Sequence, residues 1–244
     1  MSAARSISLV LALLFGAAAC GDGASSAETT STTGSTPETT TTAAASPVRI
    51  LTVGDSITAG PYYRAPLQRL LAADDCQVDF VGSAVDEDPD QPGLSDPDHE
   101  GHGGWRADQV ADNARAWAEA AEPDVILLYV GVNDFYGSAS APGDDVATVV
   151  ADVTRAVEEL RAGAPEATLL VARIMPAVGL EAQVPELNAA VAQLAGDGVT
   201  IVDFEAGFEH AKDTVDGVHP SPDAAERMAE VWYEALAPHL ACGG

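Results

Sequence analysis

The sequence from residue 48 onward predicts an α/β domain, a three-layer α/β/α sandwich around a parallel sheet of about five strands. Short apolar runs alternate along the chain with longer stretches that repeat apolar residues at helical spacing. The runs are apolar on both faces, as expected for strands that helices cover from either side. Only a crossover of helix length can return the chain in the same direction, so this alternation indicates parallel strands.

The individual elements follow from the same two patterns. Strands are expected at residues 48–53, 78–81, 125–130, 168–172 and 199–202, and the run 125–130, Val-Ile-Leu-Leu-Tyr-Val, carries the strongest signal. Helices are expected at residues 61–73, 107–120, 144–162, 185–194 and 223–240. A long polar loop joins the second strand to the second helix. The sequence shows no internal repeat.

The first 20 residues are expected to direct export. Arg5 precedes an apolar run at 7–15, and Ala17-Ala18-Ala19-Cys20 follows it, which is typical of a signal peptide and too short to span a bilayer. A cysteine after small residues also resembles a bacterial lipoprotein signal, although that family usually has Leu where this chain has Ala17. We favour lipidation of Cys20, which would anchor the protein to the outer face of a bacterial cell membrane. Ordinary cleavage and free secretion is the alternative.

Residues 21–47 are expected to form a disordered linker. Thr, Ser, Ala and Gly dominate this stretch and it contains no large apolar residue, so it cannot bury enough surface to offset its ordering entropy. A flexible coil of this length reaches about 25 to 30 Å, enough to hold a domain clear of a surface. The remaining residues, 48–244, are expected to form one folded domain.

The net charge of the chain limits the classes of molecule that it can bind directly. The 244 residues include 11 Lys and Arg against 38 Asp and Glu, a formal net charge of -27. The field of such a protein repels phosphates, so nucleic acid and an anionic membrane surface are excluded as direct partners, whereas a neutral substrate is compatible. Contact with a membrane is therefore expected only through an anchor at Cys20. The sequence does not indicate an oligomeric state.

Two further cysteines, Cys76 and Cys242, follow the linker. In an exported protein such residues can pair, which would tie the end of the first helical region to the carboxyl terminus. The sequence gives no distance between them, so a disulfide and two separate thiols both stay open.

Four polar, glycine-containing segments fall at the ends of predicted strands or before helices. They are residues 54–60 (Gly-Asp-Ser-Ile-Thr-Ala-Gly), 98–105 (Asp-His-Glu-Gly-His-Gly-Gly-Trp), 131–134 (Gly-Val-Asn-Asp) and 213–220 (Asp-Thr-Val-Asp-Gly-Val-His-Pro). Ligands of parallel sheets bind beyond the carboxyl ends of the strands. The four segments are therefore expected to build one site.

In this order, Gly-Asp-Ser, a loop Gly, Gly-x-Asn-Asp and Asp-x-x-His-Pro resemble the conserved blocks of the SGNH, or GDSL-type, hydrolases. The resemblance covers residues 48–240 and implies the SGNH hydrolase fold with its flavodoxin-like sheet. Residues 98–106 further resemble carbohydrate esterase family three, the acetylxylan-esterase-like branch. Members of that branch often have Ser where this chain has Gly103, which should matter little to the backbone donor beside it.

The residue types agree with ester hydrolysis, which needs a nucleophile, a base, a group that orients the base, and donors to the oxyanion. Ser56 is the candidate nucleophile and His219 the base. Asp216, three residues before the base, can bond its other ring nitrogen. The candidate oxyanion donors are the backbone N–H groups of Ser56 and Gly104 and the side-chain amide of Asn133. This chemistry requires no metal and no cofactor.

Several of these residues allow another interpretation. Ser56 could cap a helix that begins near Thr58, and Asp216 with His219 could form a salt-bridged surface turn. Asp55 is expected to bond backbone around the nucleophile turn. Trp105 could line the substrate cleft or pack in the core. His102 could support the loop that carries the Gly104 donor.

Three competing chemistries do not match the spacing. The surroundings of Ser56 lack the Gly-x-Ser-x-Gly pattern of α/β-hydrolases, and the histidines at 99 and 102 lack the His-Glu-x-x-His pattern of zinc proteases. The acidic loop 86–98 could bind calcium weakly, but it has no Gly at the sixth position and no closing Glu of a calcium loop. A solvated loop is the simpler interpretation.

The sequence thus predicts an extracellular serine esterase that removes acyl groups, most simply acetyl, from a polysaccharide such as acetylxylan through an acyl-enzyme intermediate. The substrate class is implied by the resemblance alone. A lipase, thioesterase or other small-ester hydrolase of the same family is one alternative. A tethered glycan-binding lipoprotein without turnover is an alternative from another class.

Overall fold

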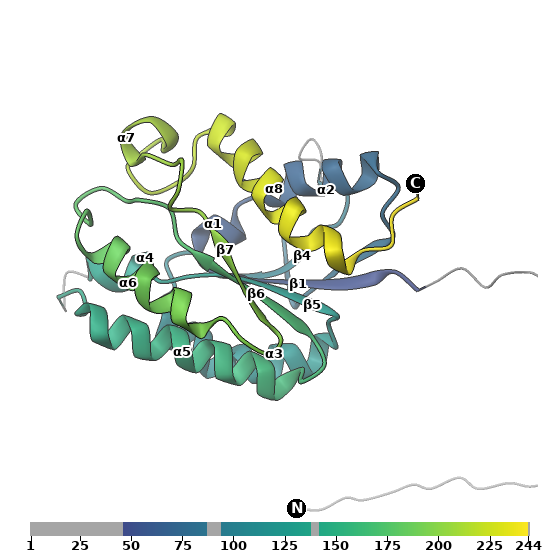
Figure 1. The fold of residues 1–244 in the computed structure, drawn as a ribbon, viewed down its shortest axis with the longest axis horizontal. Coiled ribbons are helices and arrows are strands. Elements are labelled where there is room, and N and C mark those ends of the chain that lie inside the picture. Colours follow the sequence, from purple (N-terminus) through teal and green to yellow (C-terminus); the bar gives the residue numbers. More distant parts are fainter. Residues whose placement is uncertain (1–45, 87–93, 138–141, 244) are drawn as a thin grey trace, which may run out of the picture. The chain divides into compact units, whose positions relative to one another are not determined.

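The computed structural model describes residues 46–86, 94–137 and 142–243 (Figure 1). The expected signal peptide, Cys20 and nearly all of the expected linker lie outside the described residues. None of the helices in the described ranges is both long and apolar enough to cross a membrane.

A seven-stranded sheet forms the middle layer of the described residues. Six strands run parallel: β1 (Val48–Gly54), β2 (Val78–Val81), β4 (Asp98–Gly101), β5 (Val125–Tyr129), β6 (Thr168–Arg173) and β7 (Val199–Asp203). The seventh, β3 (Ala84–Val85), is antiparallel to β4. The order is β3-β4-β1-β5-β6-β7, and β2 also pairs with β1. The predicted α/β class and its five apolar strands are confirmed.

The helices cover both faces of this sheet (Figure 1). On one face α2 (Arg64–Ala73) packs against α8 (Pro222–Leu236), and on the other α3 (Ala107–Ala121), α5 (Val146–Gly163) and α6 (Gln183–Val191) lie together. Three short helices are α1 (Ser56–Ala59), α4 (Val132–Tyr136) and α7 (His210–Asp213). The long helices pack their apolar faces against the central strands, in which Ile50, Leu51 and Leu127 are fully buried.

Several helix boundaries differ from the prediction. The first long helix begins at Arg64 instead of residue 61, and α6 ends at Val191, where a 3₁₀ turn, Ala192–Leu194, continues the chain. The last helix ends at Leu236 and is followed by a 3₁₀ turn, Ala237–His239. Pro238 within that turn has no N–H to continue a helical ladder, which accounts for the early end.

The predicted long polar loop contains the two short strands β3 and β4. Strand β4 has the sequence Asp-His-Glu-Gly, and an apolar pattern cannot reveal it, yet His99 and Glu100 are buried. The backbone N–H of Ser83 donates to Glu100 Oε1, and the other carboxylate oxygen lies 3.1 Å from His102 Nε2. Buried polar groups are tolerated where they are hydrogen-bonded in this way.

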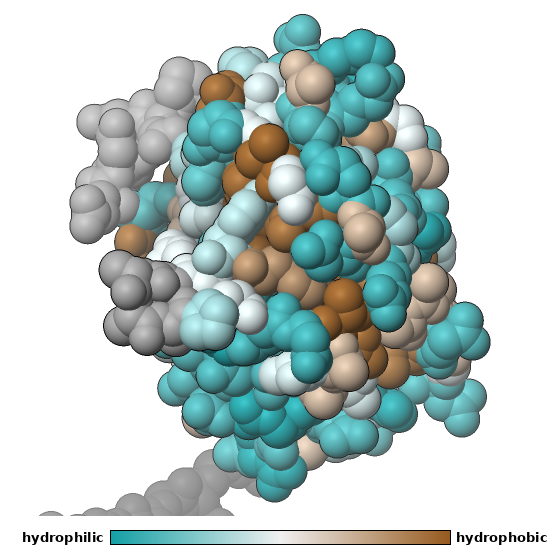
Figure 2. Space-filling model, turned by 90° about the vertical axis from the view of Figure 1, so that its left-hand side faces the viewer, coloured by the Kyte–Doolittle hydropathy of each residue, from teal (hydrophilic) through white to brown (hydrophobic). Residues whose placement is uncertain are grey.

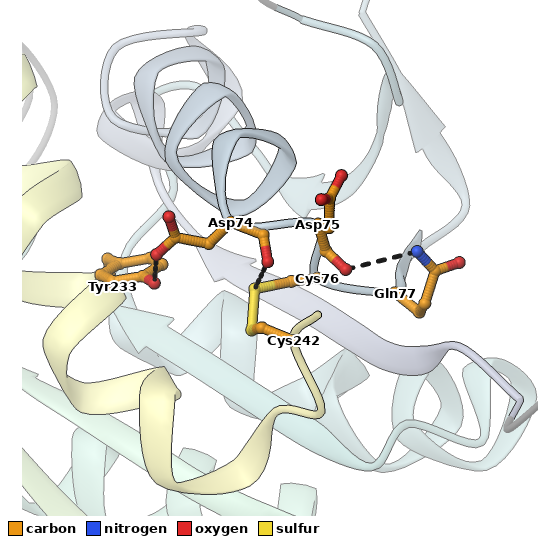
Figure 3. The surroundings of a disulfide bond; sticks show 6 residues. All are labelled: Asp74, Asp75, Cys76, Gln77, Tyr233 and Cys242. Carbon is orange, nitrogen blue, oxygen red and sulfur yellow. Dashed lines mark hydrogen bonds between the residues drawn. A yellow bond between two sulfur atoms is a disulfide. The ribbon is translucent and has the colours of Figure 1, made fainter. Parts of the chain in front are cut away.

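Cys76 and Cys242 form a disulfide bond (Figure 3). The bond joins the turn after α2 to the segment after α8. Of the two alternatives left open by the sequence, the structure therefore shows the disulfide and not two separate thiols. Next to it, the hydroxyl of Tyr233 on α8 donates to the carboxylate of Asp74. The carboxyl-terminal segment is thus fixed to the amino-terminal half of the sheet.

Candidate active site

The first site segment follows β1 at the carboxyl edge of the sheet. Asp55 caps α1, because its Oδ1 accepts the backbone N–H of Ile57 at 2.9 Å. The alternative that Ser56 is a helix cap is therefore wrong, and Asp55 bonds backbone as expected. A side chain at Gly54 would meet the carbonyl oxygen of Tyr129 at 2.1 Å, so only glycine fits between β1 and β5 at this point.

The structure brings Ser56, His219 and Asp216 together in one hydrogen-bonded chain. Ser56 Oγ lies 2.8 Å from His219 Nε2, and His219 Nδ1 lies 2.7 Å from Asp216 Oδ2. With Asp216 ionised, Nδ1 carries the ring proton and Nε2 is left to accept the serine proton. Asp216 and His219 thus face the serine instead of forming only a surface ion pair.

Asp216 is held as an anion by its own loop. Its Oδ1 accepts the backbone N–H of His219 at 2.8 Å and of Val218 at 3.0 Å. The backbone bond from His219, followed by the bond from its imidazole, lowers the pKa of Asp216 to about 2. The aspartate therefore stays charged throughout the range in which a histidine can act as a base.

The candidate oxyanion donors come from three neighbouring strand ends. Ser56 follows β1, Gly104 follows β4, and Asn133 lies in α4 just after β5. Among the described residues, no acceptor is paired with the N–H of Ser56 or of Gly104. Asn133 Nδ2 donates to the carbonyl of Trp105 at 2.9 Å, which fixes the amide beside the Gly104 loop and leaves its second N–H.

A family comparison decides the class of this site. The model of the GDSL-like Lipase/Acylhydrolase family matches residues 52–227. The chain belongs to the GDSL-like lipase/acylhydrolase family. The resemblance inferred from the four sequence segments is confirmed, and the folded domain is a carboxylic ester hydrolase of the GDSL type.

Solved structures similar to this GDSL domain include carbohydrate esterases. An acetyl esterase with an acetate ion has a TM-score of 0.69 and 28% identity, and the match covers 79% of this chain and 97% of that one. A carbohydrate esterase family 3 protein from Talaromyces cellulolyticus has a TM-score of 0.65 and 28% identity, covering 79% and 97%. A family 3 carbohydrate esterase from Clostridium thermocellum has a TM-score of 0.65 and 29% identity, covering 79% and 96%.

A curated relative is larger than this GDSL-family chain. A multidomain esterase from Ruminococcus flavefaciens is 25% identical over 230 residues, which cover 80% of this chain. The match spans 29% of the length of that esterase.

A buried ion pair, not anticipated from the sequence, supports the nucleophile turn of the GDSL domain. The guanidinium of Arg64 is fully buried and donates to the last carbonyls of α1, at 2.7 Å to Thr58 and 3.2 Å to Ala59. Asp86 accepts from the same guanidinium at 2.7 and 2.8 Å. Burial, with the nearby charge of Arg64, lowers the pKa of His99 to about 4, so this histidine beside Asp86 is neutral.

This pair also bears on the calcium hypothesis for loop 86–98. Both oxygens of Asp86 are bonded by Arg64, which removes the first acid of the loop from a calcium site. Residues 87–93 of the loop lie outside the described residues.

Within the described ranges, three carboxylates could share a metal ion, those of Asp134, Asp144 and Asp152. Both oxygens of Asp134 already accept the N–H of Ala107, at 3.0 and 3.1 Å.

Asp134, next to the oxyanion candidate Asn133, has a structural position. By accepting the first N–H of α3, it holds the start of this helix against α4. Burial raises the pKa of Asp134 to about 6, against the lowering effect of that bond. The loop with the Gly104 donor leads directly into α3, so Asp134 fixes the far end of that loop.

Trp105 and His102 support the loop from the other side. The His102 ring is stacked on Trp105, with centroids 4.2 Å apart, and on Trp117, with centroids 4.8 Å apart. The backbone N–H of His102 donates to the carbonyl of Gly54 at 2.9 Å. Trp105 is partly buried against the core, and His102 lies where a supporting role was expected.

Figure 2 looks onto the face beyond the carboxyl ends of the strands, where apolar residues gather in a band between hydrophilic ones. Exposed large apolar side chains of the described residues include Tyr136, Val178 and Val215. Val178 is joined to the Asp216 loop, because its N–H donates to the carbonyl of Gly217 at 2.8 Å. The surroundings of the catalytic candidates are therefore partly apolar.

Proposed function

We propose that this protein is an extracellular serine esterase that removes acetyl groups from a polysaccharide such as acetylxylan. The observation that carries the proposal is the chain of contacts from Ser56 Oγ to His219 Nε2, at 2.8 Å, and from His219 Nδ1 to Asp216, at 2.7 Å. A serine hydroxyl is a weak nucleophile until a base lies within hydrogen-bond reach, and here the base is oriented by a third group.

In the acylation step, His219 Nε2 accepts the hydroxyl proton while Ser56 Oγ attacks the ester carbonyl carbon. The carbonyl electron pair moves onto oxygen, where the N–H groups of Ser56 and Gly104 and the Asn133 amide stabilise the negative charge. Loss of one such donor costs about 3 to 4 kcal/mol of transition-state stabilisation. When the intermediate collapses, the alcohol oxygen takes the proton from His219 and leaves, and the acyl group stays on Ser56.

The deacylation step repeats this chemistry with water. His219 accepts a proton from a water molecule as the water oxygen attacks the acyl-enzyme carbonyl. Collapse breaks the bond to Ser56 Oγ, which regains its proton from His219, and the carboxylic acid leaves and gives its remaining proton to solvent. Asp216 stays ionised in both steps and stabilises the imidazolium that forms each time.

Two observations support an acetylated carbohydrate as the substrate. The similar structures include an acetyl esterase with an acetate ion and two carbohydrate esterases of family 3. The formal net charge of -27 disfavours anionic ligands and is compatible with a neutral polysaccharide.

Two further observations support a location outside the cell. The signal-like residues 1–20 precede the linker, and Cys20 offers a site for a lipid anchor on the outer face of a bacterial membrane. The Cys76–Cys242 disulfide fits an oxidising compartment.

The test measures acetate release from acetylated xylan and hydrolysis of acetyl, butyryl and octanoyl nitrophenyl esters, by the wild-type protein and by Ser56→Ala. We expect Ser56-dependent release from xylan and a marked preference for acetyl. Activity confined to longer acyl chains would indicate a lipase or thioesterase. If no substrate is turned over in a Ser56-dependent way, the serine mechanism is refuted and a glycan-binding role becomes the better explanation.

A further inference from the structure

A groove of about 410 Å³ opens between the start of α8 and the segment that leads into α2. Its walls are mostly apolar and include Tyr62, Pro66, Val215, Pro220, Pro222 and Glu226. The volume lies within the range of small-ligand sites, about 300 to 1,000 Å³. The groove is separate from the Gly104 and Asn133 segments that hold the oxyanion donors.

The groove lies beside His219, because two of its lining residues, Tyr62 and Val215, contact this histidine. The ring of Tyr62 is stacked on the imidazole of His219, with centroids 5.8 Å apart and planes 25° apart. On the opposite wall, the backbone N–H of Val215 donates to the carbonyl of His219 at 2.9 Å. Gly60 lets the tyrosine lie against the backbone, because a Cβ at this position would come within 2.4 Å of Tyr62 Cε2.

The chemistry of the proposed reaction decides which part of an ester reaches this groove. The alcohol oxygen must approach His219 Nε2, since it takes its proton from that atom as it leaves. The carbonyl oxygen must instead point to Ser56, Gly104 and Asn133. The group attached to the alcohol oxygen therefore extends past His219 and onto Tyr62, whereas the acyl group is not required to do so.

We propose that this groove binds the alcohol portion of the substrate, and that its occupant is a sugar ring of the acetylated polysaccharide; the inference rests on the proposed esterase function. Tyrosine and proline rings match the C–H face of a sugar. The Tyr62 hydroxyl and the exposed carboxylate of Glu226, which pairs with Arg69, offer hydrogen bonds to sugar hydroxyls. An acyl chain would have no use for these polar groups at the rim.

The test compares esters that share the acetyl group and differ in the alcohol. We expect Tyr62→Ala in the full chain to lower the ratio of kcat/KM for an acetylated xylo-oligosaccharide over that for ethyl acetate about ten-fold. Val215→Ala, at a 66% exposed position where folding is not at risk, should lower the same ratio about three-fold. Tyr233→Ala is the matched control, a tyrosine near the end of α8 beside the Cys76–Cys242 disulfide and outside the groove, and should leave the ratio unchanged.

Equal losses on both esters in Tyr62→Ala would overturn the proposal, since the ring would then act only on His219. The proposal would also be overturned if Tyr62→Ala lowered the ratio of kcat/KM for ethyl butyrate over that for ethyl acetate and left the ratio for the xylo-oligosaccharide over ethyl acetate unchanged. That result would place the acyl chain in the groove. Binding of unacetylated xylotriose to Ser56→Ala protein, measured by calorimetry, needs no turnover. The double variant Ser56→Ala/Tyr62→Ala should bind xylotriose about ten-fold more weakly than Ser56→Ala. Equal binding by the two proteins would refute the sugar subsite, whether or not the wild-type protein proves to be an esterase.

Discussion

Asp55 is predicted to make the stability of this domain depend on pH. Its side chain is fully buried beside the nucleophile, Oδ1 accepts one backbone N–H, and Oδ2 has no hydrogen-bond partner in the described part of the chain. Burial raises the pKa of Asp55 from 3.8 to about 7, although the Ile57 N–H and the nearby His219 oppose the shift. The folded state thus favours the protonated acid.

The sign and size of the effect follow from linkage. Because the folded pKa of Asp55 lies above the unfolded value, its contribution to stability is fully present below about pH 4 and is lost as pH rises to about 7. One unit of pKa shift is worth about 1.4 kcal/mol, so the full loss amounts to about 4 kcal/mol. Asn is uncharged and nearly isosteric, so Asp55→Asn should not lose this contribution.

The assay is urea unfolding of the wild-type protein and Asp55→Asn between pH 4 and 8. The difference in free energy of unfolding between the two should grow by about 4 kcal/mol in favour of the variant over this range. The other acids are common to both proteins and cancel in the difference. Asp223→Asn, at an exposed position in the first turn of α8, is the control for the loss of one negative charge, and the difference for Asp55→Asn at pH 8 should clearly exceed the difference for this control. A flat difference for Asp55→Asn would refute the reasoning.

Three further predictions follow from the contacts. Replacing Cys76 and Cys242 with Ser opens a link across 166 residues and should lower the free energy of unfolding by about 5 kcal/mol, as measured by urea unfolding. Asp216→Asn should lower kcat about 10⁴-fold with little change in KM, because Nδ1 of His219 is no longer held as the proton donor. Asp86→Ala leaves the buried charge of Arg64 without a partner and should cost about 3 to 5 kcal/mol of stability.

Each of these predictions has a contrary result. An unchanged urea midpoint after loss of both cysteines would show that the disulfide does not constrain the unfolded chain. Activity of Asp216→Asn within ten-fold of the wild type would exclude its orienting role. Asp79→Ala is the control for Asp86→Ala, because its ion pair with Arg49 is 41% and 43% exposed and should contribute less than about 1 kcal/mol. Equal losses in these two variants would contradict the burial argument.

The five predicted strands could be found from the sequence because each contains a short apolar run, and β5 is the clearest case. In β5, all five residues are buried, and the run carries no polar side chain except the Tyr129 hydroxyl. That hydroxyl accepts the N–H of Met175 at 3.0 Å. The catalytic candidates could be found for a related reason, because their residue types and order fit one reaction.

Arg64 and Tyr62 could not be assigned roles in this way. Both lie in a segment that the sequence predicts as helix or helix start, and nothing local distinguishes them. The role of Arg64 depends on its ion pair with Asp86, which follows β2 in the chain. The role of Tyr62 depends on its contact with His219, which lies 157 residues later in the sequence. Contacts between distant segments depend on the fold, which a pattern along the chain does not contain.

Strand β4 shows how the site and the missing sequence signal are connected. Strand β2 pairs with the first half of β1 and β4 with its end, so the loop after β4 arrives directly beside the nucleophile turn. Gly101 must be small, because a Cβ there would lie 2.2 Å from the N of Ala59 in α1. Glu100 must be polar to bond Ser83 and His102, and His102 stacks on Trp105 next to Gly104. The side chains that position the oxyanion loop are therefore the same ones that remove the apolar pattern of a strand.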